Sequence, residues 1–136
     1  MERRFPRDNG SLPAIYAFIR EFFAANGIDA GRAWDVDLIA EELFTNVIKY
    51  GGASQAPVAL DLTWAAPTLT LRLRDPAGGA FDPTQAPAVD ITMPLQQRRG
   101  GGLGLHLVRK MTDHMAFIRE PDGSTITVTK KLVGDV

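Results

Sequence analysis

The glycine-rich run that leads directly into a helical pattern is the feature that most constrains this chain. Residues 99–108 read Arg-Gly-Gly-Gly-Leu-Gly-Leu-His-Leu-Val, and no spacer separates the glycines from the apolar, helix-compatible segment. Glycine lacks a Cβ, so its backbone can approach a bulky anion closely. The first N–H groups of a helix are unpaired and carry a partial positive charge. The run therefore predicts a phosphate site at a helix N-terminus, with a flexible linker as the alternative.

A polar stripe on another helical segment indicates related chemistry. Residues 33–50 predict a helix that Gly51 ends. On a wheel of about 100° per residue, Glu42, Asn46 and Lys49 fall within roughly one-sixth of the circumference. An asparagine inside a helix competes for backbone hydrogen bonds, but its amide oxygen is a suitable Mg²⁺ ligand. We interpret the stripe as functional, with a solvated face as the alternative. The opposite side is apolar and contains Val36, Ala40, Leu43, Phe44 and Val47.

A strictly alternating segment ends in a carboxylate. Residues 69–75 alternate so that their leucines and Asp75 share one face of a predicted strand. A carboxylate at the end of an apolar row costs free energy unless it is paired. We interpret Asp75 as the acceptor for an exocyclic amine such as that of adenine, with exit from the core at the strand end as the alternative. Gly78 and Gly79 follow and would let a flat ring approach.

Together these segments resemble the GHKL ATPases. The Glu-x-x-x-Asn helix, the Asp-turn-Gly segment ending at Phe81-Asp82-Pro83 and the Gly-Gly-Leu-Gly-Leu-His-Leu-Val-Arg-Lys helix start have the order and rough spacing of this superfamily. Its members, which share the Bergerat fold, include histidine-kinase catalytic domains, Hsp90-type chaperones, gyrase-type topoisomerases and mismatch-repair ATPases. The resemblance extends from about Phe5 to Leu132 and is greatest to the anti-sigma-factor serine kinases.

The resemblance implies ATP and Mg²⁺ as cofactors and assigns roles to individual residues. Glu42 would be the catalytic base, Asn46 the Mg²⁺ ligand and Asp75 the adenine acceptor. Arg98 or Arg99 would add charge at the γ-phosphate, with a lid edge or a partner contact as the alternative. The remaining nucleotide contacts are assigned to Lys49, Gly78, Gly79, Gly101, Gly102, Leu103, Gly104, Leu105 and Thr127.

Two of these assignments have an ordinary structural alternative, and a third departs from the family pattern. Lys49 is also well placed to be a surface lysine, and Thr127 to be a common strand residue rather than a hydroxyl that supports adenine. The glycine that follows Asp75 stands one residue later than in the usual Asp-x-Gly-x-x-Phe pattern. Either Gly78 or Gly79 would therefore take its place.

The segment patterns predict one domain over residues 1–136 with an α+β fold. We expect a two-layer sandwich in which helices pack on one face of a mixed, mainly antiparallel sheet. Residues 76–102 have no periodicity and contain several prolines, so a lid is expected at about residues 81–100. The expected helices span residues 12–25, with Ser11 as an alternative start, then 33–50 and 103–113, and the expected strands span residues 3–7, 57–64, 68–75, 115–120 and 125–132.

Composition excludes several classes of function. The chain has no cysteine, which excludes disulfides, thiolate catalysis and Cys-ligated zinc. A formal net charge of -1 gives no nucleic-acid footprint. There is no apolar stretch of transmembrane length and no signal-peptide pattern at the start, so we expect a cytoplasmic protein. His106 and His114 are isolated, which argues against a metal site or a Ser-His-Asp triad.

The function that the resemblance implies is an ATP-dependent serine/threonine kinase of the anti-sigma type. Such a kinase phosphorylates a small STAS-fold antagonist, binds a sigma factor and acts as a homodimer. The alternative is an ATP- or ADP-binding module that sequesters a partner without phosphorylating it. A detached sensor-kinase catalytic domain is disfavoured because no phospho-accepting histidine helix is present. Glu42 favours the enzyme, since nucleotide binding alone needs Asn46 and the glycines but no base.

Overall fold

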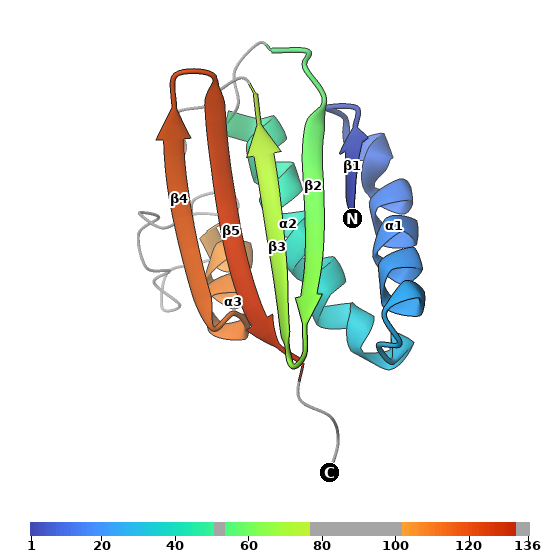
Figure 1. Cartoon of the computed structure of the whole chain (residues 1–136). Coiled ribbons are helices and arrows are strands. Elements are labelled where there is room, and N and C mark those ends of the chain that lie inside the picture. Colours follow the sequence, from blue (N-terminus) through green and yellow to red (C-terminus); the bar gives the residue numbers. More distant parts are fainter. Residues whose placement is uncertain (51–53, 77–101, 133–136) are drawn as a thin grey trace.

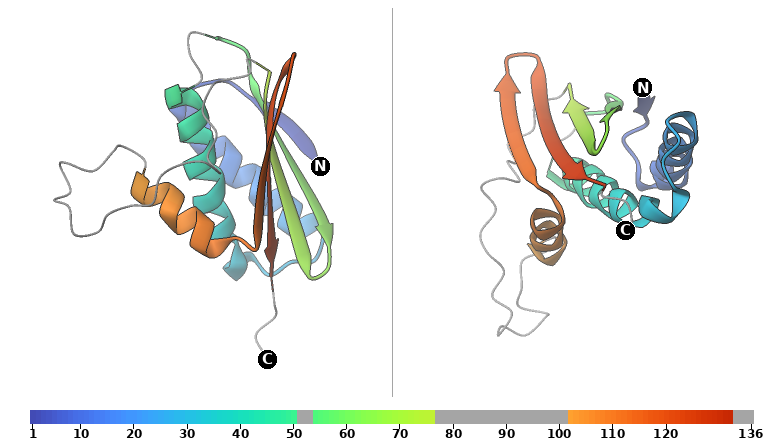
Figure 2. Two further views of the ribbon diagram at one scale, coloured as in Figure 1. Left: turned by 90° about the vertical axis from the view of Figure 1, so that its left-hand side faces the viewer. Right: turned by 60° about the horizontal axis from the view of Figure 1, so that its bottom comes forward.

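The computed structural model describes residues 1–50, 54–76 and 102–132, which form a sheet covered by helices on one face (Figures 1 and 2). The sheet has five strands in the order β1-β2-β3-β5-β4. All the pairings among these strands are antiparallel, so the predicted α+β sandwich is confirmed without a parallel pair in the described part of the chain. The strands are β1 (Glu2–Phe5), β2 (Val58–Ala65), β3 (Thr68–Asp75), β4 (His114–Glu120) and β5 (Gly123–Lys131).

The helices lie close to their predicted positions. They are α1 (Leu12–Ala25), α2 (Ala33–Tyr50) and α3 (Gly102–Met111), preceded in two cases by the short 3₁₀ turns η1 (Asn9–Ser11) and η2 (Ala30–Arg32). The third helix ends before the expected Asp113 because the Asp113 amide donates to the Thr129 carbonyl at 2.9 Å and so joins β5. Within the described residues, no helix is long and apolar enough to cross a lipid bilayer.

The amphipathic pattern of α1 predicts its buried face. Its buried residues are Ile15, Phe18, Ile19, Phe22 and Phe23, the apolar stripe of the sequence. The helix ends where the Asn26 side-chain amide donates to the Phe22 carbonyl at 2.9 Å. Gly27 then takes a left-handed conformation with φ 66°, which glycine adopts without strain and which commonly ends a helix.

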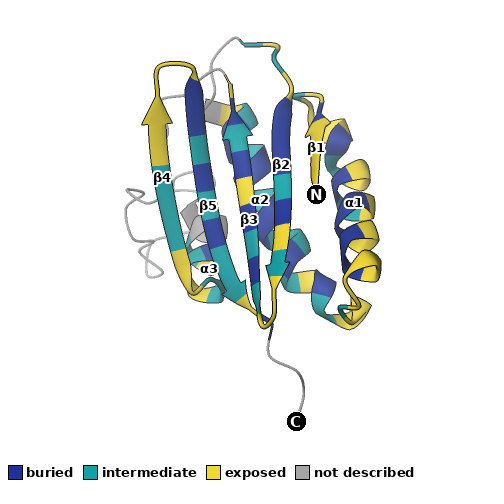
Figure 3. Cartoon of the chain, viewed as in Figure 1, coloured by how far each residue is buried: buried dark blue, intermediate teal, exposed yellow. Residues whose placement is uncertain are grey.

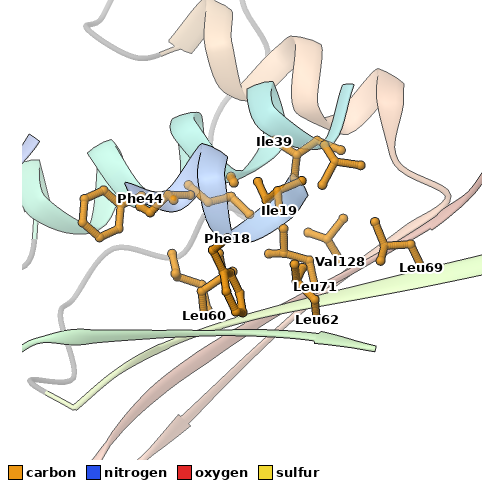
Figure 4. Packing of buried hydrophobic residues seen from close by; sticks show 14 of the residues in the cluster. Phe18, Ile19, Ile39, Phe44, Leu60, Leu62, Leu69, Leu71 and Val128 are labelled. Atoms are coloured by element: carbon orange, nitrogen blue, oxygen red, sulfur yellow. The ribbon is translucent and has the colours of Figure 1, made fainter. Parts of the chain in front are cut away.

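The core lies between the inner face of the sheet and the first two helices. Burial alternates along β3, and along β2 after its first three residues, which are all buried; this is expected for strands with one covered face (Figure 3). Figure 4 shows side chains of α1 and α2 facing those of β2, β3 and β5, and its labelled residues are Phe18, Ile19, Ile39, Phe44, Leu60, Leu62, Leu69, Leu71 and Val128. This packing fixes the rotation of α2 and therefore the direction of its polar stripe.

The register between β3 and β5 decides which side chains face the helices. Leu73 lies opposite Ile126, and both are buried on the inner face. Two residues further along β3, Asp75 lies opposite Ser124, and these two are also buried on that face. Because side chains alternate along a strand, Thr127 points to the outer face. The inner face of the sheet therefore ends in a polar pair.

Gly123 begins β5 at the point where this strand approaches the end of β3. Its φ is +150°, and a Cβ at this position would lie 2.6 Å from the backbone oxygen of Asp75. Real Cβ atoms do not come so close to backbone, so a side chain here would push Asp75 and Pro76 away. The close approach of the two strands therefore depends on glycine.

We predict that Gly123→Ala lowers the free energy of unfolding by about 1–3 kcal/mol, since it overpacks a contact made by backbone. Chemical denaturation measures this loss. The control is Gly10→Ala, whose Cβ would meet the Asp8 carboxylate at an ordinary 3.4 Å. That variant should stay within about 0.5 kcal/mol of the wild type. Equal stability of the two variants would contradict the steric argument.

Candidate functional site

The polar stripe of α2 is solvated only in part. The side chain of Asn46 is buried, with the residue only 4% exposed, whereas Glu42 is half-buried and Lys49 is exposed. The Asn46 amide nitrogen Nδ2 donates to the backbone carbonyl of Glu42 at 2.6 Å. This bond fixes the carboxamide and leaves its oxygen Oδ1 as the atom suited to accept a hydrogen bond or bind a metal ion. The burial and fixed orientation of Asn46 are therefore not those of an ordinary asparagine on a helix surface.

Glu42 lies one turn before Asn46 and has a perturbed carboxyl group. Loss of solvent around the half-buried side chain is the main effect that raises its pKa above the ordinary glutamate value. The neighbouring negative charge of Glu41 raises the pKa further. A carboxylate with a raised pKa is a better proton acceptor, which is the property a general base requires.

A hydrogen bond between the first two helices holds Glu41 in place. The Tyr16 hydroxyl on α1 donates to the Glu41 carboxylate on α2. Desolvation, followed by this hydrogen bond and the charges of Glu41 and Asp37, raises the pKa of Tyr16 to about 12. Tyr16 therefore remains a neutral donor at physiological pH. Glu41 is engaged with α1, while Glu42 is left as the carboxylate associated with Asn46.

Asp75 forms a buried ion pair that the sequence did not predict. Its carboxylate oxygen Oδ1 pairs with the Arg7 guanidinium, and the side chains are only 4% and 5% exposed, respectively. The same guanidinium donates from Nε to the Ala56 carbonyl at 3.0 Å. The pair explains how a carboxylate can end an apolar row. No local sequence signal joins residues so far apart in the chain; only the unusual position of Asp75 indicated that a partner must exist.

The structure does not bring Thr127 beside Asp75, and Ser124 is the better candidate for a hydroxyl near that carboxylate. Thr127 lies opposite Arg72, on the sheet face away from the helices. Its hydroxyl therefore cannot support a base that Asp75 contacts from the inner face. Ser124 lies directly opposite Asp75 and is 6% exposed. Sequence reasoning missed it because the start of β5 was placed at Thr125, two residues too late.

The glycine-rich run contributes the start of α3. The helix begins at Gly102, so its first turn contains Gly102, Leu103, Gly104 and Leu105. These are residues that the sequence analysis assigned to phosphate binding through backbone N–H groups. The other residues assigned to the nucleotide in this region lie outside the described residues. They are Gly78, Gly79, Arg98, Arg99 and Gly101, together with the expected lid at about residues 81–100.

The candidate residues come from elements that pack together. Helix α2 contacts both β3 and α3. The last turns of α2 and the end of β3 lie at the same end of the molecule (Figure 1). The described part of the chain holds no cluster of three or more histidine, cysteine or acidic residues that would bind a metal by itself. Oxygen atoms of a bound anion would be suitable further ligands for a metal ion at Asn46.

Comparison with known proteins assigns a family. A family model described as a histidine kinase-like ATPase domain matches residues 5–130. A curated relative, the serine/threonine-protein kinase BtrW of Bordetella bronchiseptica (strain ATCC BAA-588 / NCTC 13252 / RB50), is 29% identical over 94 residues. The match covers 68% of this chain and 66% of the relative, so the chain spans just under two thirds of that kinase.

Two solved structures share the fold. The RsbU and RsbW domains of Rv1364c from Mycobacterium tuberculosis superpose with a TM-score of 0.67 at 15% identity, over 96% of this chain and 32% of that one. The histidine kinase domain of the blue-light activated histidine kinase EL346 from Erythrobacter litoralis gives a TM-score of 0.50 at 15% identity, over 94% and 62% of the two chains. These structures confirm the fold that the three motifs predicted.

The raised pKa of Glu42 predicts a pH-dependent effect of Glu42→Gln on stability. A carboxyl whose pKa is higher in the folded state favours folding when protonated, and this contribution is lost as pH rises through the folded pKa. The neutral glutamine avoids that loss. Thermal unfolding should therefore show Glu42→Gln gaining stability over the wild type from pH 4.5 to 8. Glu21→Gln, at an exposed surface pair, serves as the control, and a gain no larger than that of the control would contradict the raised pKa.

Proposed function

Because this chain belongs to the histidine kinase-like ATPase domain family, we propose that it is an ATP-dependent protein serine/threonine kinase of the anti-sigma type. The observation that carries the proposal is the buried, oriented Asn46 one helical turn from the half-buried Glu42. One residue suits a metal ion and the other suits proton transfer. Together they provide the parts that phosphoryl transfer needs from a protein, which are positioning and charge stabilisation.

The residues of the site fit Mg²⁺ and ATP. Asn46 Oδ1 would bind the ion, since Nδ2 is committed to the Glu42 carbonyl. The first turn of α3 would hold phosphate oxygens through backbone N–H groups. Asp75 and Ser124, buried at the end of the inner face, would contact the adenine. When bound, ATP supplies the phosphoryl group, and Mg²⁺ offsets the charge of its phosphates.

Glu42 would act as the base that accepts the proton of the attacking hydroxyl. Its raised pKa supports this role, because a more basic carboxylate takes the proton more readily. Glu41 does not compete for the role, because the Tyr16 hydroxyl binds its carboxylate. A module that only binds nucleotide would have no use for a desolvated carboxylate beside Asn46, so the perturbed Glu42 favours the enzyme over a sequestering module.

The proposed acceptor is a serine or threonine of a STAS-domain antagonist. The relative BtrW is named a serine/threonine-protein kinase, and the mycobacterial chain that shares the fold contains an RsbW domain. Incubation of the protein with labelled ATP, Mg²⁺ and candidate STAS proteins tests the proposal. Label on the STAS chain supports a kinase, and binding of ATP without transfer to any candidate favours the sequestering module.

Asn46→Ala should weaken the binding of Mg·ATP at least tenfold while binding of ATP in EDTA changes little. The reason is that the lost oxygen is proposed to bind the ion and not the base or sugar; one such contact to a charged group is worth about 1.5–3 kcal/mol. Titration calorimetry with and without Mg²⁺ measures both affinities. Thr45→Ala is the control, since its hydroxyl donates to the Glu42 carbonyl at 3.3 Å and is not proposed to bind the ion. Unchanged Mg·ATP affinity in Asn46→Ala would refute the ligand role.

Glu42→Gln should separate nucleotide binding from chemistry. Loss of a positioned base lowers the rate of transfer about 10²–10⁴-fold. The affinity for Mg·ATP should change little, since Glu42 is not proposed to bind the nucleotide. Single-turnover transfer of label to the STAS protein measures the rate. Glu41→Gln is the matched neighbour and should stay within about tenfold of the wild type, because Glu41 bonds Tyr16 and affects transfer through the pKa of Glu42 alone. Equal rates for Glu42→Gln and the wild type would exclude Glu42 as the base.

A further inference from the structure

The ion pair between Arg7 and Asp75 spans three strands of the sheet. Arg7 follows the end of β1, and Asp75 is the last residue of β3. The guanidinium reaches Asp75 past the start of β2, where Nε donates to the carbonyl of Ala56 at 3.0 Å. Arg7 thus binds both the backbone that precedes β2 and the carboxylate at the end of β3. Two contacts from one planar group define the position of that carboxylate.

Stability alone is a poor explanation for this pair. Removing two charges from water costs more free energy than their attraction returns unless the remaining polar atoms are also bonded. Here the Nη1 atom of Arg7 is buried and has no hydrogen-bond partner among the described residues. An unsatisfied buried donor destabilises the fold and calls for an explanation outside packing. By contrast, the ion pair between Arg74 and Asp122, at 3.1 Å, is exposed, so its polar atoms can still bond to water.

We propose that Arg7 is a positioning residue for base recognition, an inference that rests on the proposed ATP-binding function. Its guanidinium holds Asp75 through Oδ1, so that the carboxylate presents its remaining acceptor sites to the exocyclic amine of adenine. A carboxylate has about four lone-pair positions, and the guanidinium contact at Oδ1 occupies one of them. Arg7 itself need not touch the nucleotide.

The proposal depends on the fork of the guanidinium. Arginine offers several N–H groups in a rigid plane, and Arg7 uses Nε for Ala56 and Nη2 for Asp75. A lysine has one compact charge and cannot reproduce both contacts with the same geometry. Methionine has a similar length but no hydrogen-bonding group. Arg7→Lys therefore removes the paired N–H geometry but keeps the positive charge. Arg7→Met removes both.

The experiment compares two nucleotides that differ only in the exocyclic amine. Calorimetric titration of the full chain with Mg·ATP and with the Mg²⁺ complex of purine riboside triphosphate gives an affinity ratio, which reports the amine contact alone. We expect the wild type to prefer ATP by about tenfold, the value of one hydrogen bond to a charged group. Arg7→Met should reduce the preference to about twofold or less, and Arg74→Met should keep it.

Every outcome bears on the positioning role. Loss of the preference in Arg7→Met, with no further loss when Asp75→Asn is added, supports the proposal. Equal weakening of both nucleotides, or a lower melting temperature with an unchanged ratio, would show that Arg7 is structural and would overturn it. If Arg7→Met does not fold, an unchanged ratio in Arg7→Lys overturns it as well. A wild type that binds ATP without preferring the amine also refutes it but leaves the proposed function intact, whereas a wild type that binds no ATP refutes both.

Discussion

The burial of one face of the sheet under α1 and α2 is the constraint on which the rest of the structure depends. The apolar side of α2 contains Val36, Leu43 and Phe44, all at most 1% exposed, and these contacts fix how the helix is rotated. With the rotation fixed, Glu42 and Asn46 must lie along the edge of the contact with the sheet. The candidate site is therefore a consequence of core packing, and its polar groups are placed by apolar neighbours that take no part in the chemistry.

Much of this arrangement is accessible from sequence because it depends on local periodicity. The bounds of α2, the alternation that ends at Asp75 and the buried stripe of α1 all follow from side-chain spacing along single elements. Asn46 was recognisable for the same reason, since a poor helix former on a narrow stripe is unusual within one helix. Periodicity thus identified the residues but not their burial, and burial is what distinguishes Asn46 from an ordinary surface asparagine.

The parts that sequence reasoning missed depend on pairings between distant elements. Arg7 and Asp75 are separated by 68 positions, and nothing near Arg7 indicates a buried partner. The choice between Ser124 and Thr127 depends on which face of the sheet each occupies, and a register difference of one residue reverses the face. The pairing of β5 with β3 places Ser124 opposite Asp75, and Gly123 allows the close approach of the two strands there. These constraints exist only in the assembled sheet.

The polar features that are unfavourable for folding gather around the candidate site. Among the described residues, a buried arginine has a nitrogen without a hydrogen-bond partner, a glutamate is desolvated beside another glutamate, and a buried asparagine lies within a helix. Each departs from the rules by which sequences specify stable folds, and such departures are expected where function opposes stability. The ion pairs away from this region, such as Arg3 with Glu21 and Arg20 with Asp37, have a well-exposed arginine. Such pairs contribute little to the free energy of unfolding, because the charge of the arginine stays in contact with water. The contrast supports the proposal that the end of β3 and the adjacent turns of α2 form a ligand site.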